Sequence, residues 1–163
     1  GLVKDLAGAL DMAGKTLACC SRCGSVTSVA DDPCRLCTST HRDTAVVCVV
    51  EDALDIELIE KSGGYRGRYH ALGGRLSPMK RMGPQDLRVK VLLDRIDQEK
   101  FEEVILALST DVEGDATASF VTEMLQGRKV KISRLAFGLP AGSGIVYSDP
   151  VTLSRAFKGR TAG

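Results

Sequence analysis

The pattern of hydrophobic positions is centred on the short run Val46–Val50, in which five consecutive residues are apolar and four are β-branched. A run without polar alternation is typical of a strand that is buried on both faces of a parallel sheet. Two carboxylates, Glu51 and Asp52, follow it directly. In open α/β sheets the functional crevice lies at the carboxyl ends of the strands. We therefore expect the end of this strand to contribute to function.

Strand and helix patterns alternate along the rest of the chain. Short apolar runs predict three further strands, at Arg68–Leu72, Glu103–Leu108 and Val130–Ala136. Helical spacing predicts a first helix over residues 2–13, ended by Gly14, and later helices at Ala53–Lys61, Gln85–Ile96, after Asp115 and at Thr152–Phe157. From the central strand onward the order is β-α-β-α-β-α-β-α. This order predicts an α/β fold, with a parallel sheet covered by helices on both faces.

Two cysteine pairs precede the central strand. Cys20-x-x-Cys23 and Cys34-x-x-Cys37 are separated by ten residues. Each pair can form a tight turn that presents two sulfurs to one ion, and four thiolates suit structural Zn²⁺. The segment is too short to bury a core, so the metal would supply its folding energy.

Other uses of the cysteines are weaker. Disulfides are disfavoured because the sequence shows no export signal, and an iron–sulfur or redox site is the remaining alternative. Cys19 is treated as a non-ligand because Cys20 gives the two-residue spacing. Cys48 lies inside the central strand and is expected to be a small core residue.

The net charge of +1 conceals blocks of one sign. Residues 45–60 hold five acids and no bases, and residues 101–127 hold six acids and no bases. Residues 61–100 hold ten bases against four acids, and residues 128–163 hold seven bases against one acid. Such blocks predict surfaces of both signs, with ordinary solvated faces as the alternative.

Acids follow two of the predicted buried strands. Glu51 and Asp52 end the first strand of the sheet, and Asp111, Glu113 and Asp115 come after the third. In a parallel sheet both groups lie at the same edge, and clustered carboxylates are what Mg²⁺ and metal-assisted phosphoryl chemistry need. The alternative for Glu113 and Asp115 is that they complement the positive end of a helix.

A long loop punctuated by glycine and proline follows the second predicted strand and carries Arg75, Lys80 and Arg81. Loops of this length are often functional, although a surface connector is the plainer interpretation. Other chemistry finds little support in the sequence. His41 and His70 are the two histidines, neither has a partner suggested by spacing, and no phosphate-binding P-loop is present.

Seven motifs follow one another between residues 20 and 160. They are C-x-x-C…P-C-x-x-C at Cys20–Cys37, H-R-D at His41–Asp43, V-C-V-V-E at Val47–Glu51, Y-R-G-R-Y-H-A-L-G-G-R-L-S-P at Tyr65–Pro78, E-V-I-L-A at Glu103–Ala107, V-E-G-D-A-T-A at Val112–Ala118 and G-L-P-A-G-S at Gly138–Ser143. In this order and spacing the chain resembles the RecR family of bacterial recombination mediators. The part from Thr44 onward looks like a Toprim domain.

The resemblance implies a domain layout and a set of partners. The layout is a helix trailing a missing N-terminal helix-hairpin-helix domain at 1–18, a four-cysteine zinc finger at 19–43, a Toprim domain at 44–140 and a C-terminal segment at 141–163. The implied activity is to help RecO, and in some settings RecF, load RecA onto single-stranded or gapped DNA. The implied protein is a cytoplasmic, nucleoid-associated homodimer or homotetramer. DNA binding is expected to be weaker without the N-terminal domain.

Ser109 bears on catalysis. Catalytic Toprim enzymes carry D-x-D-x-E-G-E, and Ser109 stands where the first Asp is expected. The resemblance therefore implies that the protein is not an enzyme and that Mg²⁺ is at most weakly held beside the structural Zn²⁺. We expect an acidic surface that docks a basic partner such as RecO, formed by Glu51, Asp111, Glu113 and Asp115. We expect a second set of residues to face DNA phosphates, namely Arg75, Lys80 and Arg81. A Mg²⁺-dependent Toprim nuclease or primase-like enzyme, and a docking module that never touches DNA, are the alternatives.

Overall fold

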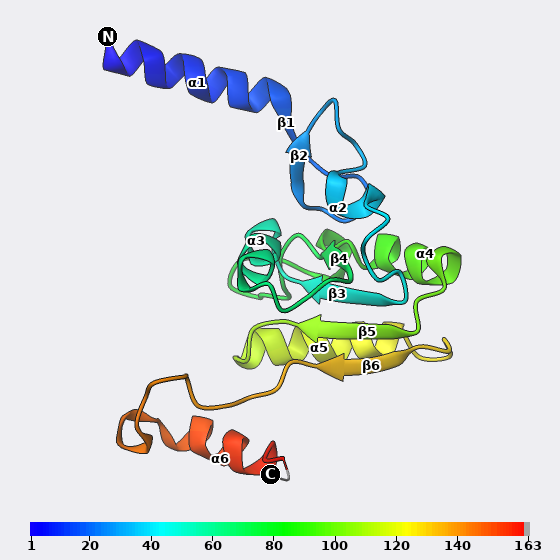
Figure 1. The fold of residues 1–163 in the computed structure, drawn as a ribbon, viewed down its shortest axis with the longest axis vertical. Helices are drawn as coiled ribbons and strands as arrows, with labels where there is room; N and C mark the ends of the chain where they lie inside the picture. The colour runs from blue at the N-terminus through cyan, green and yellow to red at the C-terminus, as the bar shows by residue number, and fades with distance from the viewer. Residues whose placement is uncertain (162–163) are drawn as a thin grey trace. The chain divides into compact units, whose positions relative to one another are not determined.

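A parallel sheet of order β4-β3-β5-β6 forms the centre of the fold in the computed structural model (Figure 1). Its strands are β3 (Val46–Val50), β4 (Arg68–Ala71), β5 (Glu103–Ala107) and β6 (Lys131–Arg134). β3 pairs in parallel with both neighbours, with Val47 opposite Arg68 on one side and Val46 opposite Glu103 on the other. The structure describes residues 1–161, which divide into a first unit ending at Ser133 and a second beginning at Arg134.

β3 is buried on both faces, as its sequence predicts. Val47 and Val49 point into one hydrophobic core, and Cys48 and Val50 point into another. This alternation follows from the two-residue period of a strand, in which successive side chains face opposite sides of the sheet. The predicted central strand is therefore confirmed within its expected bounds.

Helices cover both faces of the sheet and confirm the predicted fold class. α3 (Ala53–Ser62) packs Ile56 into the core that contains Cys48. α4 (Val89–Glu99) and α5 (Val112–Met124) contribute to the core on the opposite face. The sheet therefore lies between α3 on one face and α4 and α5 on the other.

Helix starts differ from the sequence prediction in two places that bear on the site. α4 begins at Val89 instead of Gln85, because Pro84–Asp86 forms a separate 3₁₀ turn (η1). α5 begins at Val112, so Glu113 and Asp115 lie inside its first turn and not before it. Asp111 is the N-cap of α5, which accounts for this early start.

The N-terminal helix is also longer than predicted. α1 runs over Leu2–Thr16 and passes through Gly14, which was expected to end it. One glycine costs a helix only about 1 kcal/mol, so it does not force an end where good helix formers follow. None of the residues of α1, Leu2–Thr16, is buried.

The cysteine-rich segment has secondary structure that the sequence did not predict. β1 (Leu17–Cys19) and β2 (Val26–Ser28) form an antiparallel pair, and α2 (Arg35–Thr38) is a single helical turn. In the second unit, η2 (Ile145–Tyr147) precedes α6 (Pro150–Lys158), which is capped by Asp149. Among residues 1–161, no helix has the length and apolar character that crossing a membrane requires.

Candidate functional site

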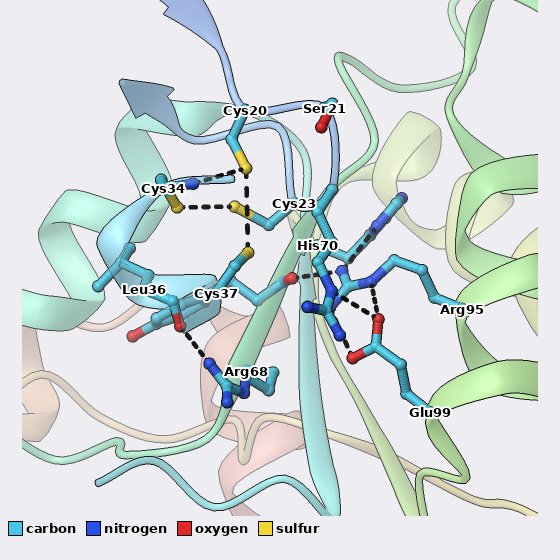
Figure 2. A network of polar contacts seen from close by, with 12 residues as sticks. Cys20, Ser21, Cys23, Cys34, Leu36, Cys37, Arg68, His70, Arg95 and Glu99 are labelled. Atoms are coloured by element: carbon cyan, nitrogen blue, oxygen red, sulfur yellow. Dashed lines mark hydrogen bonds and ion pairs between the residues drawn. The ribbon is translucent and has the colours of Figure 1, made fainter. Parts of the chain in front are cut away.

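The four predicted cysteine ligands meet in one buried cluster. The Sγ atoms of Cys20, Cys23, Cys34 and Cys37 all lie within 4.8 Å of one another. The Cys23–Cys34 pair is 3.5 Å apart and the Cys20–Cys37 pair 3.9 Å apart, so each pair joins the two halves of the segment. Four converging thiolates are a donor set that fits a tetrahedral metal ion. Figure 2 shows the four sulfurs facing one another.

Backbone amides and a glycine shape the turns that hold these sulfurs. The backbone N–H of Ser25 donates to the Cys23 sulfur at 3.4 Å, and the N–H of Cys34 donates to the Cys20 sulfur at 3.3 Å. Gly24 adopts φ +80°, a conformation that favours glycine, and a Cβ there would lie 2.0 Å from Nη1 of Arg88. The glycine therefore permits both the turn and the close approach of an arginine.

The two remaining cysteines lie outside the four-cysteine cluster. Cys19 is exposed, and Cys48 is buried in β3 with 3% of its surface accessible. Burial raises the pKa of the Cys48 thiol to about 12. Cys48 is therefore a neutral core residue, as predicted.

A buried polar network lies between the cysteine module, defined here as residues 17–39, and the sheet (Figure 2). Nη1 of Arg95 lies 3.2 Å from Nδ1 of His70, and Nε2 of His70 lies 2.9 Å from the backbone oxygen of Arg88. Because arginine only donates, Nδ1 is the acceptor and Nε2 carries the proton. Glu99 accepts from Arg95 at 2.8 Å and from Arg22 at 2.9 Å. His70 is therefore a neutral structural residue and is not part of the four-cysteine cluster.

His70 should make the protein sensitive to mild acid. Burial, and next the Arg95 charge, lower its pKa from 6.5 to about 3. Below pH 6.5 the unfolded chain binds a proton that the folded chain excludes, so stability falls as the pH drops towards 3. Between pH 7 and pH 5 we expect the loss to be about 2 kcal/mol larger than in His70→Gln, which keeps a donor for Arg88. Urea unfolding of both proteins in excess metal measures this difference, and equal losses would contradict it.

The acidic edge is defined as Glu51, Asp111, Glu113 and Asp115, which follow the ends of β3 and β5 in the chain. The Arg75 guanidinium lies among three of these acids. It lies 2.8 Å from Asp111, 3.2 Å from Glu113 and 3.8 Å from Glu51. Asp115 is partly buried on the first turn of α5. The sequence had assigned Arg75 to the DNA-facing cations, whereas the structure places it against the acids.

Two of these acids also hold the backbone in place. Glu51 accepts from the N–H of Ser109 at 2.8 Å, which ties the end of β3 to the turn after β5. Asp111 accepts from the N–H of Gly114 at 2.8 Å and so caps α5. This hydrogen bond, and next the hydrogen bond from Arg75, lower the pKa of Asp111. Asp111 therefore caps the helix, and Glu113 and Asp115, for which the sequence offered a helix-end role, lie in the first turn of α5.

The base of the long loop is fastened to α5 by residues that sequence reasoning missed. Ser77 is buried and its Oγ donates to Glu113 at 2.6 Å. The N–H of Leu76 donates to Oγ1 of Thr117 at 3.0 Å. The preceding Gly73 and Gly74, both at positive φ, are the signal in the sequence that a sharp return of the chain occurs here.

The tip of this loop presents the other two predicted cations. Ser77 and Met82 exchange backbone hydrogen bonds of 3.0 and 2.9 Å, which closes a tight turn. Lys80 and Arg81 are exposed on this turn, next to Met79. The basic tip, defined as residues 79–81, is therefore separate from Arg75, which is engaged at the base.

The fold and the site together define a class of protein: a Toprim domain joined to a four-cysteine module. A family model of the Toprim domain matches residues 45–136, and the model for the C-terminal region of RecR matches residues 138–161. The chain is 49% identical over 157 residues to the recombination protein RecR of Moorella thermoacetica, covering 96% of this chain and 78% of that protein.

Two further relatives carry the same name. Recombination protein RecR of Bifidobacterium longum subsp. infantis is 44% identical over 96% of this chain and 78% of its own length. Its counterpart in Desulfatibacillum aliphaticivorans is 44% identical over 98% of this chain and 81% of its own length. The chain therefore belongs to the RecR family.

Proposed function

We propose that this protein is a non-catalytic scaffold for DNA recombination and repair, which helps RecO and RecF load RecA onto single-stranded or gapped DNA. It would act as a homodimer or homotetramer. The position of Arg75 is the main support for the proposal that the protein is not a catalyst. Its guanidinium lies within 4 Å of three carboxylates that a catalytic Toprim domain would offer to Mg²⁺. A fixed cation there opposes a second one.

The four-cysteine cluster has a different role in this proposal. It would hold one Zn²⁺ as a structural ion, because all four donors are thiolates, the cluster is buried and four donors leave no open position for a substrate. The metal would fold the module and would take no part in chemistry on DNA.

Replacing Arg75 by glutamine should strengthen binding of Mg²⁺ or Mn²⁺ at the acidic edge by about tenfold, because one positive charge within 4 Å of the carboxylates is removed. Titration with Mn²⁺, followed by its paramagnetic resonance signal, measures this affinity. Arg81→Gln is the matched control, since it removes the same charge from the exposed tip. Equal affinities in the Arg75 variant and the parent would remove this support for a non-catalytic role.

The acidic edge and the basic tip suggest two separate docking functions. The carboxylates would steer a basic partner, most plausibly RecO, because exposed charges accelerate association more than they add affinity. Lys80 and Arg81 would contact DNA phosphates, because both are exposed cations on a tight turn.

Charge changes on the two surfaces should separate these functions. Glu113→Gln keeps an acceptor for Ser77 but removes a charge, and should slow partner association about three- to tenfold at low salt. The double variant Lys80→Glu, Arg81→Glu should make the slope of log DNA affinity against log salt concentration shallower by about 2. It should leave the affinity for the protein partner unchanged. Stopped-flow association and DNA titration across salt concentrations measure the two effects. If Glu113→Gln left association unchanged at low salt, the acids would be assigned to helix capping alone.

The alternatives give other results in the same assays. A Mg²⁺-dependent Toprim nuclease or primase-like enzyme would nick or copy DNA, and Glu51→Gln would abolish that activity. A pure docking module would show no salt-dependent DNA affinity at all. Ser109 at the first position of the D-x-D-x-E-G-E pattern favours the scaffold over the enzyme.

A further inference from the structure

The outer edge of β4 is covered by the cysteine module, and we propose that this cover depends on the module's metal ion. When the metal is lost, the edge becomes a strand-pairing surface for a second copy of this chain. β4 stands at one end of the sheet order β4-β3-β5-β6, so within residues 1–161 its outer side faces no other strand. An uncovered strand edge is a template for pairing with another chain.

The backbone of β4 shows which groups the module covers. The N–H of Leu72 points inward and donates to Val50 at 2.9 Å. Because neighbouring residues of a strand point to opposite sides, the backbone groups of Tyr69 and Ala71 point outward. The N–H of Ala71 donates to the backbone oxygen of Cys23 at 2.7 Å. The outward oxygen of Tyr69 accepts from Arg95 of α4 at 2.7 Å, so the module occupies the Ala71 N–H and α4 occupies the Tyr69 oxygen.

Two arginine side chains, one from β4 and one from the start of α4, hold the module against this edge. Arg68 of β4 donates to the backbone oxygen of Leu36 at 2.7 Å (Figure 2). It also donates to the backbone oxygen of Ser39 at 2.9 Å. Nη2 of Arg88 donates to the backbone oxygen of Ser21 at 2.7 Å. Because the acceptors are backbone oxygens, these contacts depend on the backbone conformation of the module and not on the identity of its side chains.

The module's chain path in turn depends on the cysteines. Each module residue in these contacts, Ser21, Cys23, Leu36 and Ser39, is a cysteine ligand or lies within two residues of one. The buried core of the module consists of the four cysteines, with Leu36 partly buried against them. Without a metal this core holds too little apolar surface to fold, and the backbone contacts are lost with it.

A second copy of the chain is the partner that fits the uncovered edge. The side chains of all four β4 residues, Arg68–Ala71, are buried in this structure, which is typical of an interior strand and not of an edge adapted to solvent. Two such edges can pair with each other about a two-fold axis, because a two-fold contact uses the same surface on both copies.

The first test is amide hydrogen exchange before and after removal of the metal by a chelator. The full chain carries Cys19→Ser and is kept reduced, so that the exposed Cys19 cannot form cross-links. At low protein concentration the Ala71 amide should exchange at least about tenfold faster without metal, whereas the inward Leu72 amide should change little. An unchanged Ala71 amide, or equal acceleration of both amides, overturns the proposal.

The second test is the size of the assembly, measured by sedimentation. The metal-free protein should form a larger assembly than the metal-loaded protein, and added Zn²⁺ should reverse the change. The variant Ala71→Pro lacks the outward N–H, and proline is tolerated on an edge strand. The metal-free form of this variant should therefore not form the larger assembly. Protection of its Leu72 amide shows whether this variant is folded. If the metal-free parent kept its metal-loaded size, or if the folded proline variant associated equally, the proposal would be wrong.

Discussion

Replacing Cys34 by serine should lower the metal content of the purified protein from about one ion per chain to nearly zero. Four thiolates supply the donors and the buried core of the cysteine module, so one missing sulfur removes both a ligand and part of the core. A structural zinc site of this kind contributes roughly 10 kcal/mol or more to folding. We therefore expect the module to unfold while the sheet keeps its structure.

Cys19→Ser is the matched control for this prediction. Cys19 is adjacent to a ligand in sequence but is exposed and outside the cluster. The control should therefore keep its metal and its unfolding temperature. Elemental analysis after purification without chelators, and amide exchange of residues 17–39, distinguish the two variants. Equal metal content in both would refute the assignment of Cys34 as a ligand.

The parts of the fold that the sequence predicts well are governed by local rules. The run Val46–Val50 becomes a strand buried on both faces, because its apolar residues satisfy both cores at once. The two-residue spacing of each cysteine pair predicts one four-cysteine cluster, and the four sulfurs do lie within 4.8 Å of one another. The same reasoning placed α3 within one residue of its observed bounds, Ala53–Ser62.

The parts that the sequence does not predict depend on contacts between distant residues. Arg75 and Asp111 are 36 positions apart, and charge blocks along the chain suggested that they would face different partners. They meet because Gly73 and Gly74 turn the loop back over α5, where Ser77 fastens it to Glu113. Nothing in the charge pattern alone distinguishes Arg75 from the exposed Lys80.

The cover over β4 was hidden from sequence analysis for the same reason. Arg68 and Arg88 lie in the basic stretch of residues 61–100, and their side chains bind backbone oxygens of the cysteine module. Backbone acceptors carry no sequence signature. The contacts that join the cysteine module to the sheet can therefore be seen in the structure but not in the sequence.

Gly114→Ala should be the most damaging small substitution in the Toprim part of the chain. A Cβ at this position would lie 2.0 Å from the backbone oxygen of Ser109 and 2.6 Å from its carbonyl carbon. Backbone atoms cannot swing away as a flexible side chain does, so α5 would have to shift from the end of β5. Forcing extra volume into a packed site costs typically 1–3 kcal/mol, and this contact is closer than usual. We expect a loss of about 3 kcal/mol or more in the free energy of unfolding.

The displacement would also separate the acids, because Asp111 and Glu113 flank the start of α5 and Glu51 binds the N–H of Ser109. Gly14→Ala is the matched control: nothing lies within 4 Å of the position that its methyl group would take, and alanine favours a helix by about 1 kcal/mol over glycine. Urea unfolding should show a large loss for Gly114→Ala and none for Gly14→Ala. A Gly114→Ala protein with parental stability would mean that the turn after β5 is not fixed where Glu51 holds it.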